Sequence, residues 1–156
     1  MEMENVVIRR AEPQDSGELA AMCHSLWPDL SAAEHAVELA PFLAGKPPGN
    51  LPAIVLLAQE STGHILGFIE VGLRSHADGC DPSRPVGFIE GWYVRPEDRR
   101  RKVGALLLAA AEQWARDAGC EEMASDTWLD NLASQNVHEA LGFEVVDRCV
   151  HYRKRL

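Results

Sequence analysis

RPEDRRRKVGALLLAAAEQW (residues 95–114) joins a turn to a basic segment and then to a long apolar helix pattern. Four consecutive cations, Arg99 to Lys102, stand directly before that pattern in a chain whose formal net charge is −9. A helix N-terminus presents unpaired backbone N–H groups and the positive end of the helix dipole, and a glycine such as Gly104 lets an anion approach the backbone. The stretch therefore predicts a binding site for a diphosphate-bearing ligand, with a solvated run of surface charge as the alternative.

The helix in this stretch carries apolar residues at helical spacing and ends at Gly119. The stripe that we expect to be buried consists of Val103, Leu106, Leu107, Ala110, Trp114 and Ala118. Before the turn, VGFIEGWYV (86–94) is typical of a strand, and its glycines at 87 and 91 indicate a bulge or a close approach by another group. The motifs GxxxxGK[ST] and GxGxxG do not occur, which argues against a P-loop and a Rossmann site.

The rest of the chain predicts strands and helices in mixed order. Asp15 is a candidate N-cap for a helix that runs to about Trp27, and the capping box SAAE (31–34) starts a second helix that reaches about Leu43. Strands are expected at 6–10, 53–59, 64–74, 122–127 and 143–153, a helix at 134–141 and a polar loop at 75–85. The order β-α-α-β-β-β-α-β-α-β predicts an α/β (mixed α+β) fold, one domain over residues 1–156, with a mixed central sheet and helices on both faces.

Composition narrows the function classes. The net charge and a pI near 5.1 disfavour nucleic acid as a partner. An acidic surface can attract a cationic small molecule, with acidity for solubility alone as the alternative. No apolar run is long enough to span a membrane, and MEMENVVIRR (1–10) lacks the pattern of a signal peptide, so a cytoplasmic protein without a membrane partner is expected. The four cysteines form no CxxC pair and the six histidines show no HxxxH or HExxH spacing, so neither a metal site nor a disulfide framework is predicted.

The strand at 86–94, the R-x-x-x-x-G sequence at 99–104 and the helix after it resemble the acetyl-CoA-binding core of the GNAT acetyltransferase superfamily. Within it, the chain resembles the aminoglycoside 6'-N-acetyltransferases through SLWP (25–28), GFIEGWYV (87–94), GCEEMASDT (119–127), ALGFE (140–144) and YRKR (152–155). The resemblance implies the GNAT fold, with the fourth and fifth strands splayed apart, and acetyl-CoA as co-substrate without a metal. Lys102 departs from the superfamily pattern, which usually has a glycine there.

The resemblance also assigns residues to the cofactor. They are Trp92, Tyr93, Val94, Arg99, Arg100, Arg101, Lys102, Val103, Gly104, Ala105 and Asn131. The backbone of 92–94 is expected to hold the pantetheine arm and to polarise the thioester. The loop at 99–105 is expected to surround the diphosphate, and Asn131 to touch the CoA chain.

Acetyl transfer to an amine needs a base for the amine proton, donors for the oxygen that gains charge and a proton for the leaving thiolate. The resemblance and this chemistry together give as candidate residues Glu90, Asp126 and His138 for catalysis, and Trp27, Glu90, Asp126 and Asp147 for substrate binding. For Trp27 the alternative is a core tryptophan that closes a helix. Glu90 is expected to act as base or to bind an amine, with a solvent-facing strand end as the alternative. Asp126 stands at a strand end, where open sheets place ligands, and a turn residue is its alternative. His138 replaces the superfamily's frequent tyrosine proton donor and can also be purely structural.

The resemblance predicts an enzyme that transfers acetyl from acetyl-CoA directly to the 6'-amine of aminoglycosides in a ternary complex. Resistance is the expected outcome, because acetylation removes a charge that these drugs need to bind RNA. Two alternatives are acetylation of another amine, such as a polyamine or a protein N-terminus, and a CoA-binding sensor without turnover. Proteins of this kind are commonly homodimers, with the C-terminal strand and the 75–85 loop near the partner. The apolar stretch GFIEVGL (67–73), interpreted as exposed, favours the same arrangement here.

Overall fold

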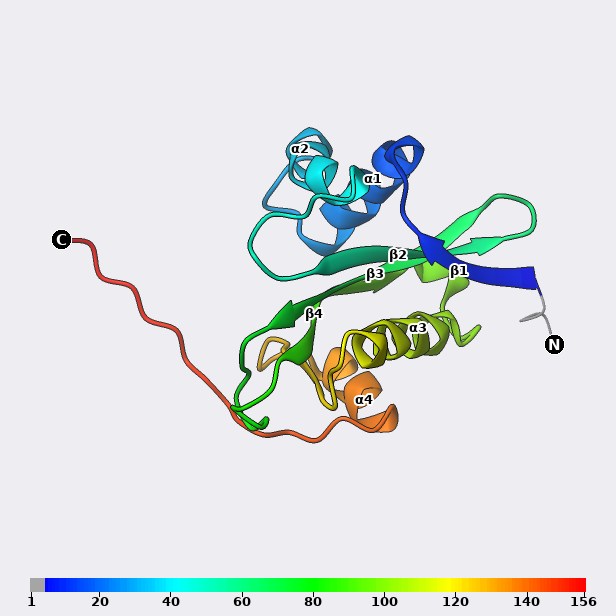
Figure 1. The fold of residues 1–156 in the computed structure, drawn as a ribbon. Coiled ribbons are helices and arrows are strands. Elements are labelled where there is room, and N and C mark those ends of the chain that lie inside the picture. Colours follow the sequence, from blue (N-terminus) through cyan, green and yellow to red (C-terminus); the bar gives the residue numbers. More distant parts are fainter. Residues whose placement is uncertain (1–4) are drawn as a thin grey trace.

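A five-stranded sheet lies between two layers of helices in the computed structural model, which describes residues 5–156 (Figure 1). The strands, in their order across the sheet, are β1 (Val6–Arg10), β2 (Ala53–Glu60), β3 (Ile65–Arg74), β4 (Val86–Val94) and β5 (Met123–Ser125). Strands β1 to β4 are antiparallel to their neighbours, and β5 runs parallel to β4. The mixed sheet predicted from the sequence is therefore confirmed. Residues 1–4, part of the stretch expected to lack a signal peptide, lie outside the described residues.

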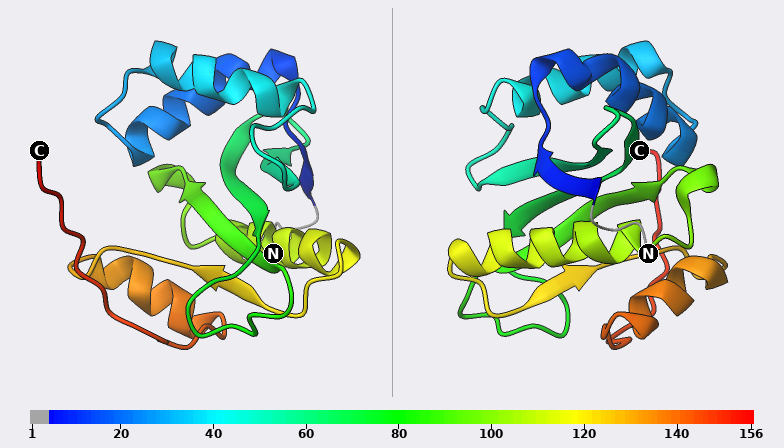
Figure 2. Two further views of the ribbon diagram at one scale, coloured as in Figure 1. Left: turned by 60° about the vertical axis from the view of Figure 1, so that its left-hand side comes forward. Right: turned by 90° about the vertical axis from the view of Figure 1, so that its right-hand side faces the viewer.

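Helices cover both faces of the sheet, as predicted (Figure 2). One face carries α1 (Ser16–Leu26) and α2 (Ala32–Leu43), and the other carries α3 (Val103–Asp117) and α4 (Leu132–Ala140). Two single-turn 3-10 helices, η2 (Pro13–Asp15) and η3 (Pro96–Asp98), precede α1 and the basic loop. Within residues 5–156, no helix combines the length and the apolar character that a membrane crossing requires.

The core has one cluster under each helical layer. Strand β3 contributes Phe68 to the cluster under α1 and α2, and Ile69 to the cluster under α3. This division follows from the strand geometry, since successive side chains point to opposite faces of the sheet. The prediction that the stretch at 67–73 is exposed is therefore wrong: it belongs to the central strand, where Phe68, Ile69 and Val71 are buried.

The N-termini of α1 and α2 differ in whether a side chain caps them. At α2 the capping box is confirmed: the Glu34 N–H donates to Ser31 Oγ at 3.1 Å, and the Ser31 N–H donates to Glu34 Oε2 at 2.8 Å. Asp15 is the N-cap residue of α1, but its side chain does not cap that helix. Its carboxylate accepts two hydrogen bonds from the Arg9 guanidinium, both at 2.8 Å, and one from the Glu12 N–H. The ion pair with β1 thus uses the oxygens that a cap would need.

The buried stripe of α3 is rotated from the predicted one. The residues that are buried are Val103, Leu107, Leu108, Ala111 and Ala115. Of the other predicted members, Leu106, Ala110 and Trp114 are half-buried, and Ala118 is exposed beyond the end of the helix. The rotation arises because α3 lies across β2, β3 and β4, so a wider face than one narrow stripe is covered.

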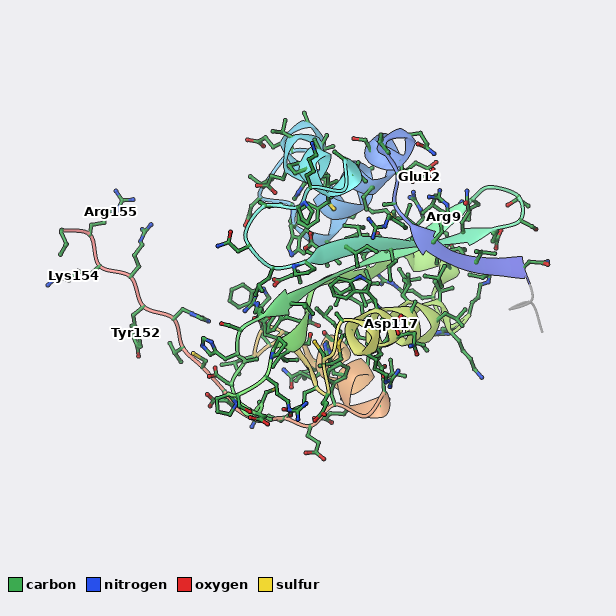
Figure 3. All side chains as sticks on the ribbon, viewed as in Figure 1. Arg9, Glu12, Asp117, Tyr152, Lys154 and Arg155 are labelled. Carbon is green, nitrogen blue, oxygen red and sulfur yellow. The ribbon has the colours of Figure 1, made fainter. Side chains whose placement is uncertain are left out.

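The predicted last strand at 143–153 is wrong. Residues 144–156, here called the C-terminal segment, form no helix or strand and are exposed throughout. The segment passes the 75–85 loop, where Val146 lies against Gly79, and then leaves the body of the molecule (Figure 1). Tyr152, Lys154 and Arg155 extend from it into open space (Figure 3). A β-rich sequence forms a strand only where a neighbouring strand accepts its hydrogen bonds, and none does so among residues 5–156.

Candidate active site

The fourth and fifth strands separate in the middle of β4. Pairing between them covers Gly87 with Met123, Phe88 with Ala124 and Ile89 with Ser125, and β4 then continues without β5. On its other side β4 is irregular at the same point, since Gly91 pairs with Glu70 and Ile89 with Val71. Glu90 is therefore the extra residue of a β-bulge, as the glycines of this strand predict. The separation leaves the backbone of residues 90–94 free of a strand partner on the β5 side.

The start of α3 forms an exposed basic loop near this opening. Arg100 and Lys102 both have left-handed backbone conformations, with φ of 67° and 60°. Glycine is the residue that adopts this conformation without strain, which explains the glycine usual at position 102 in the superfamily pattern. Arg99, Arg100 and Lys102 are exposed around the first turn of the helix.

Gly104, in the first turn of α3, has a negative φ and free space around it. A Cβ added there would lie 3.6 Å from Trp92 Nε1 and 3.7 Å from Cζ2, which is ordinary contact. Neither backbone conformation nor packing thus requires glycine at this position. The absence of a side chain leaves the first N–H groups of α3 accessible, and these groups together with the exposed cations fit a diphosphate.

Two of the predicted cofactor-binding arginines have partners within the protein. Arg99 Nε donates to the carbonyl of Val94 at 3.0 Å, and its guanidinium lies 5.9 Å from the centre of the Tyr93 ring. The Arg101 guanidinium pairs with Glu60 at 2.6 Å and with the buried Asp98 at 3.2 Å. Arg101 is thus directed toward the β2–β3 end of the sheet, and each of its two terminal nitrogens already has a carboxylate partner.

Asp98 ties this loop to the β2–β3 hairpin. Its side chain is 7% exposed and holds His64 Nε2 at 2.9 Å in addition to Arg101. His64, Glu97 and Asp98 also place ligand atoms within 4.8 Å of one another. Because the Asp98 carboxylate already has His64 and Arg101 as partners, we interpret this group as the support of the basic loop.

Two pockets lie on the α1 and α2 side of β4. One, of about 290 Å³, is lined by Trp27, His35, Phe68 and Glu70 among others. The second, of about 500 Å³, is lined by the 48–53 connector, Glu70 and Glu90. Glu70 and Phe42 line both, so the two pockets are adjacent.

Trp27 forms part of the wall of the smaller pocket. Its ring lies 6.2 Å from the ring of Phe68 and 6.1 Å from that of His35, between ring centres. A Cβ at Gly91 would be 2.8 Å from Trp27 Cζ2, so only glycine fits beneath the indole. The close approach that the sequence predicted at Gly91 is therefore confirmed, and its partner is Trp27. His35 Nε2 donates to the Trp27 carbonyl at 2.9 Å and fixes this end of α1.

The acids of the site differ in their surroundings. Glu90 forms an ion pair with Arg74. Arg74 Nε and Nη2 donate to Glu90 Oε1 at 3.0 and 2.8 Å, and Nη2 also donates to Glu90 Oε2 at 2.9 Å. Glu70 was not among the predicted site residues. Burial, followed by the charges of Glu90 and Glu38, raises the pKa of Glu70 to about 7. A single acid inside the apolar strand ILGFIEVGLR is the sequence signal that identifies it.

Cys23, from α1, lines the smaller pocket. Burial and the nearby charges of Glu70 and Glu38 raise the pKa of this thiol to about 12. The thiol therefore stays protonated at neutral pH. All four cysteines are free.

His138 and Ser125 face one another at the splayed end of β5. His138 Nδ1 donates to the Ser134 carbonyl at 2.7 Å, so in the neutral ring Nε2 accepts from Ser125 Oγ at 2.8 Å. The Trp92 ring meets the His138 ring edge-on at 5.4 Å between centres. The imidazole is thus held beside one of the residues predicted to contact the cofactor.

The remaining predicted residues lie apart from the pockets. Asp126 follows β5 and is exposed, and Asn131 uses its side-chain oxygen to cap α4 by accepting from the Ser134 N–H at 3.1 Å. Asp147 lies on the exposed C-terminal segment, where it accepts from the Arg148 N–H, and it lines neither pocket. The fold therefore gathers Trp27 and Glu90 with Glu70, and leaves Asp126 and Asp147 outside these pockets.

Known proteins are similar to this chain in both sequence and fold. The sequence profile of the acetyltransferase (GNAT) family matches residues 19–143. A relative named aminoglycoside N(6')-acetyltransferase type 1, from Klebsiella aerogenes, is 46% identical over 150 residues, which cover 96% of this chain and 97% of the relative. The solved structure of AAC(6')-Iy with the bisubstrate analogue CoA-S-monomethyl-acetylneamine has a TM-score of 0.85 at 35% identity, with 97% of this chain and 99% of that chain covered.

A second solved structure, the aminoglycoside antibiotic 6'-N-acetyltransferase AAC(6')-Ih from Acinetobacter baumannii, has a TM-score of 0.84 at 30% identity and covers 97% of this chain and 99% of that chain. The match extends over nearly the whole length of each protein, so it spans the residues of the strand separation, the basic loop and the pockets. On this sequence and structural similarity, the chain belongs to the acetyltransferase (GNAT) family.

Proposed function

We propose that this protein is an aminoglycoside 6'-N-acetyltransferase that uses acetyl-CoA. The observation that carries the proposal is the position of an acid-lined pocket and a basic loop on either side of the bulge in β4. One side suits an anionic cofactor and the other a cationic amine. The names of the relatives, which are aminoglycoside N(6')-acetyltransferases, support the choice of substrate.

Acetyl-CoA supplies an acetyl thioester. The exposed cations Arg99, Arg100 and Lys102, with the first N–H groups of α3, bind its diphosphate in this proposal. The unpaired edge of residues 92–94 then receives the pantetheine arm and directs backbone donors at the thioester. The CoA complexes named among the structural neighbours support this placement.

Glu90 and Asp126 bind ammonium groups of the substrate, from two sides of the strand opening. Glu90 lines the larger pocket, and Arg74 fixes the position of its carboxylate. Asp126 is exposed at the end of β5, where it adds negative charge for a substrate that extends beyond the pocket. Trp27 supplies an apolar wall of the adjacent smaller pocket.

The acetyl group passes directly from cofactor to amine in a ternary complex. Cys23 is the thiol that lines the pocket, and its raised pKa of about 12 leaves it protonated and a poor nucleophile. This supports direct transfer rather than an acetyl-enzyme. Initial-rate measurements that vary both substrates should give intersecting rather than parallel reciprocal plots.

His138 and Ser125 return a proton to the thiolate. Because Nδ1 donates to the Ser134 carbonyl, Nε2 is the ring nitrogen that faces Ser125; the second proton of the reacting nitrogen, taken up at Nε2, passes to Ser125 Oγ as that hydroxyl gives its own proton to the sulfur, so no charge remains on the serine oxygen. Their location beside Trp92 supports this role. Ser125→Ala should then lower kcat and leave the KM for both substrates unchanged.

A homodimer and a cytoplasmic location complete the proposal. The C-terminal segment, with Asp147 on it, carries several exposed apolar side chains that a second copy of the chain would bury. Acetyl-CoA is a cytoplasmic metabolite, which supports the location. Drug resistance follows from the loss of the 6'-ammonium charge.

The test is thiol release from acetyl-CoA by the purified protein in the presence of kanamycin or tobramycin, with the acetylated position of the product located by NMR. We expect release with both drugs and acetylation of the 6'-amine. Spermidine is the matched polyamine control, and it should give a lower kcat/KM than either drug. Absence of release across an aminoglycoside panel would refute the substrate assignment.

A further inference from the structure

We infer that Glu70, rather than Glu90, is the group that accepts the proton of the reacting amine. This inference rests on the proposed function, because it names a residue for that reaction. Glu70 projects from β3 opposite Gly91, at the bulge beside which β4 and β5 separate. It lines both pockets, so a substrate in either one reaches it.

The neighbours of Glu70 leave its oxygens free for a substrate. Among residues 5–156, no side chain forms an ion pair or hydrogen bond with Glu70, whereas both oxygens of Glu90 accept from Arg74. Glu70 is half-buried and opens to the pockets. A proton acceptor must have a free lone pair within reach of the amine, and of the two acids Glu70 meets this condition.

The groups around Glu70 also suit proton transfer near neutral pH. Glu38 of α2 and Cys23 of α1 face Glu70, and Glu38 Oε2 lies 3.9 Å from His35 Nδ1. Glu90, which pairs with Arg74, approaches Glu70 from β4. Desolvation and the two glutamates favour the neutral carboxylic acid, so the pKa of Glu70 is about 7. A base with a pKa near the working pH combines a useful ionised fraction with a strong affinity for the proton.

The step balances without a further reactant. The ionised Glu70 takes one proton from the substrate ammonium, which frees the nitrogen lone pair. The nitrogen then bonds to the acetyl carbon, the carbon–sulfur bond breaks and the sulfur keeps its electron pair. The second nitrogen proton ends on the sulfur, and Glu70 releases its proton to water.

The test compares wild type with Glu70→Gln, which keeps the shape of the side chain and removes its basicity. General-base loss typically costs about 100-fold to 10,000-fold, so kcat should fall by at least about 100-fold. In kcat/KM against pH, the wild type should lose activity below about pH 7 with a slope of one proton. The residual activity of the variant should lack this inflection. Glu112→Gln, on α3 and outside the lining of both pockets, is the matched control and should behave like wild type.

A second variant separates proton acceptance from other roles. Glu38 raises the pKa of Glu70, so Glu38→Gln should move the inflection to lower pH without abolishing turnover. Three results would overturn the inference: a kcat of Glu70→Gln within about threefold of wild type, a higher KM alone, or an inflection that Glu38→Gln does not move. The comparison uses the amine that the wild type acetylates fastest, so a failure of the aminoglycoside assignment does not decide the role of Glu70.

Discussion

A carboxylate on a central strand costs stability when it is ionised. Because the pKa of Glu70 is about 7 in the fold against an ordinary value of 4.5, the folded state holds the proton more tightly than the unfolded state does. Its contribution is therefore fully present below about pH 4.5 and is lost as the pH rises to about 7. This cost is expected at functional sites, where a group is kept in an environment chosen for reactivity.

Glu70→Gln should remove that cost. At pH 8 we expect the free energy of unfolding to rise by on the order of 2 to 3 kcal/mol, since one pKa unit corresponds to about 1.4 kcal/mol. At pH 4 wild type and variant should unfold at nearly the same denaturant concentration. Urea unfolding at the two pH values checks both statements. Equal stability at pH 8 would mean that burial does not penalise the Glu70 charge.

Two glycines make a matched pair for a second test. Gly91→Ala should destabilise the protein by about 1 to 3 kcal/mol, because the new Cβ overlaps the Trp27 ring. Gly104→Ala should leave stability unchanged or raise it by up to about 1 kcal/mol, since alanine is the better helix former.

Activity should separate the same two variants in another way. Loss of one hydrogen bond to a charged phosphate costs about 1.5 to 3 kcal/mol, so Gly104→Ala should raise the KM for acetyl-CoA by about tenfold or more. Thermal unfolding and acetyl-CoA kinetics on both variants provide the measurements. An unchanged KM for Gly104→Ala would place the diphosphate away from the first turn of α3.

The role of a single residue can be predicted from the sequence where one local chemical property determines it. A glycine inside a strand usually marks a bulge or a close contact, so the sequence predicts a close approach at Gly91, and Trp27 confirms it. Glu70 escaped prediction because its role depends on which helices cover the strand and on two acids distant in sequence. For Arg101, the sequence shows a cation in a basic run and does not show the carboxylates that engage it.

At the scale of elements, the basic loop depends on the hairpin beside it. Arg100 and Lys102 adopt a conformation that costs non-glycine residues about 1 to 2 kcal/mol each, and Arg101 between them is anchored to Glu60 and Asp98. The ion pairs of Arg101 fix the loop at the start of α3. If the basic loop binds the diphosphate, as proposed, the hairpin influences cofactor binding through the loop.

Glu60→Gln distinguishes two roles for Arg101. If Arg101 supports the loop, loss of its 2.6 Å partner should raise the KM for acetyl-CoA severalfold and leave the KM for the amine unchanged. If Arg101 binds phosphate directly, removal of a competing carboxylate should lower the KM for acetyl-CoA. We expect the first result. Glu121→Gln, which loses an exposed pair with Arg84, is the control and should change neither constant.

Elements with a local signal were predicted well. The α2 capping box and the β2 to β4 strands are set by nearby residues and by alternation, and they appear where the sequence places them. The last strand was not found because a strand needs an external partner, and β-forming residues at 143–153 do not specify one. The rotation of the α3 stripe has a similar origin, since the sheet decides which side of a helix is covered.

At the scale of the whole molecule, the C-terminal segment is the part that the proposed homodimer would cover. Val145, Val146, Val150 and Tyr152 are 53%, 62%, 64% and 92% exposed on a segment that extends away from the molecule past the 75–85 loop in Figure 1. An exposed apolar surface of this kind marks an interaction site. The charge of the segment is also opposite to that of the protein as a whole, since YRKR (152–155) carries three cations and the net charge is −9.

If the proposed homodimer forms through this segment, removal of residues 145–156 should convert it to monomers. The full chain should have about twice the 17.2 kDa of one copy in light scattering, and the shortened chain should have the mass of a monomer. Its acetyl-CoA affinity should persist, because the basic loop and the strand opening lie within the remaining residues. The pair Val146→Asp and Val37→Asp supplies the control: both place a charge on an exposed valine, and only the first lies on the segment. If the full chain is a monomer at every concentration, or if Val37→Asp dissociates it equally, another surface or no second copy covers the segment.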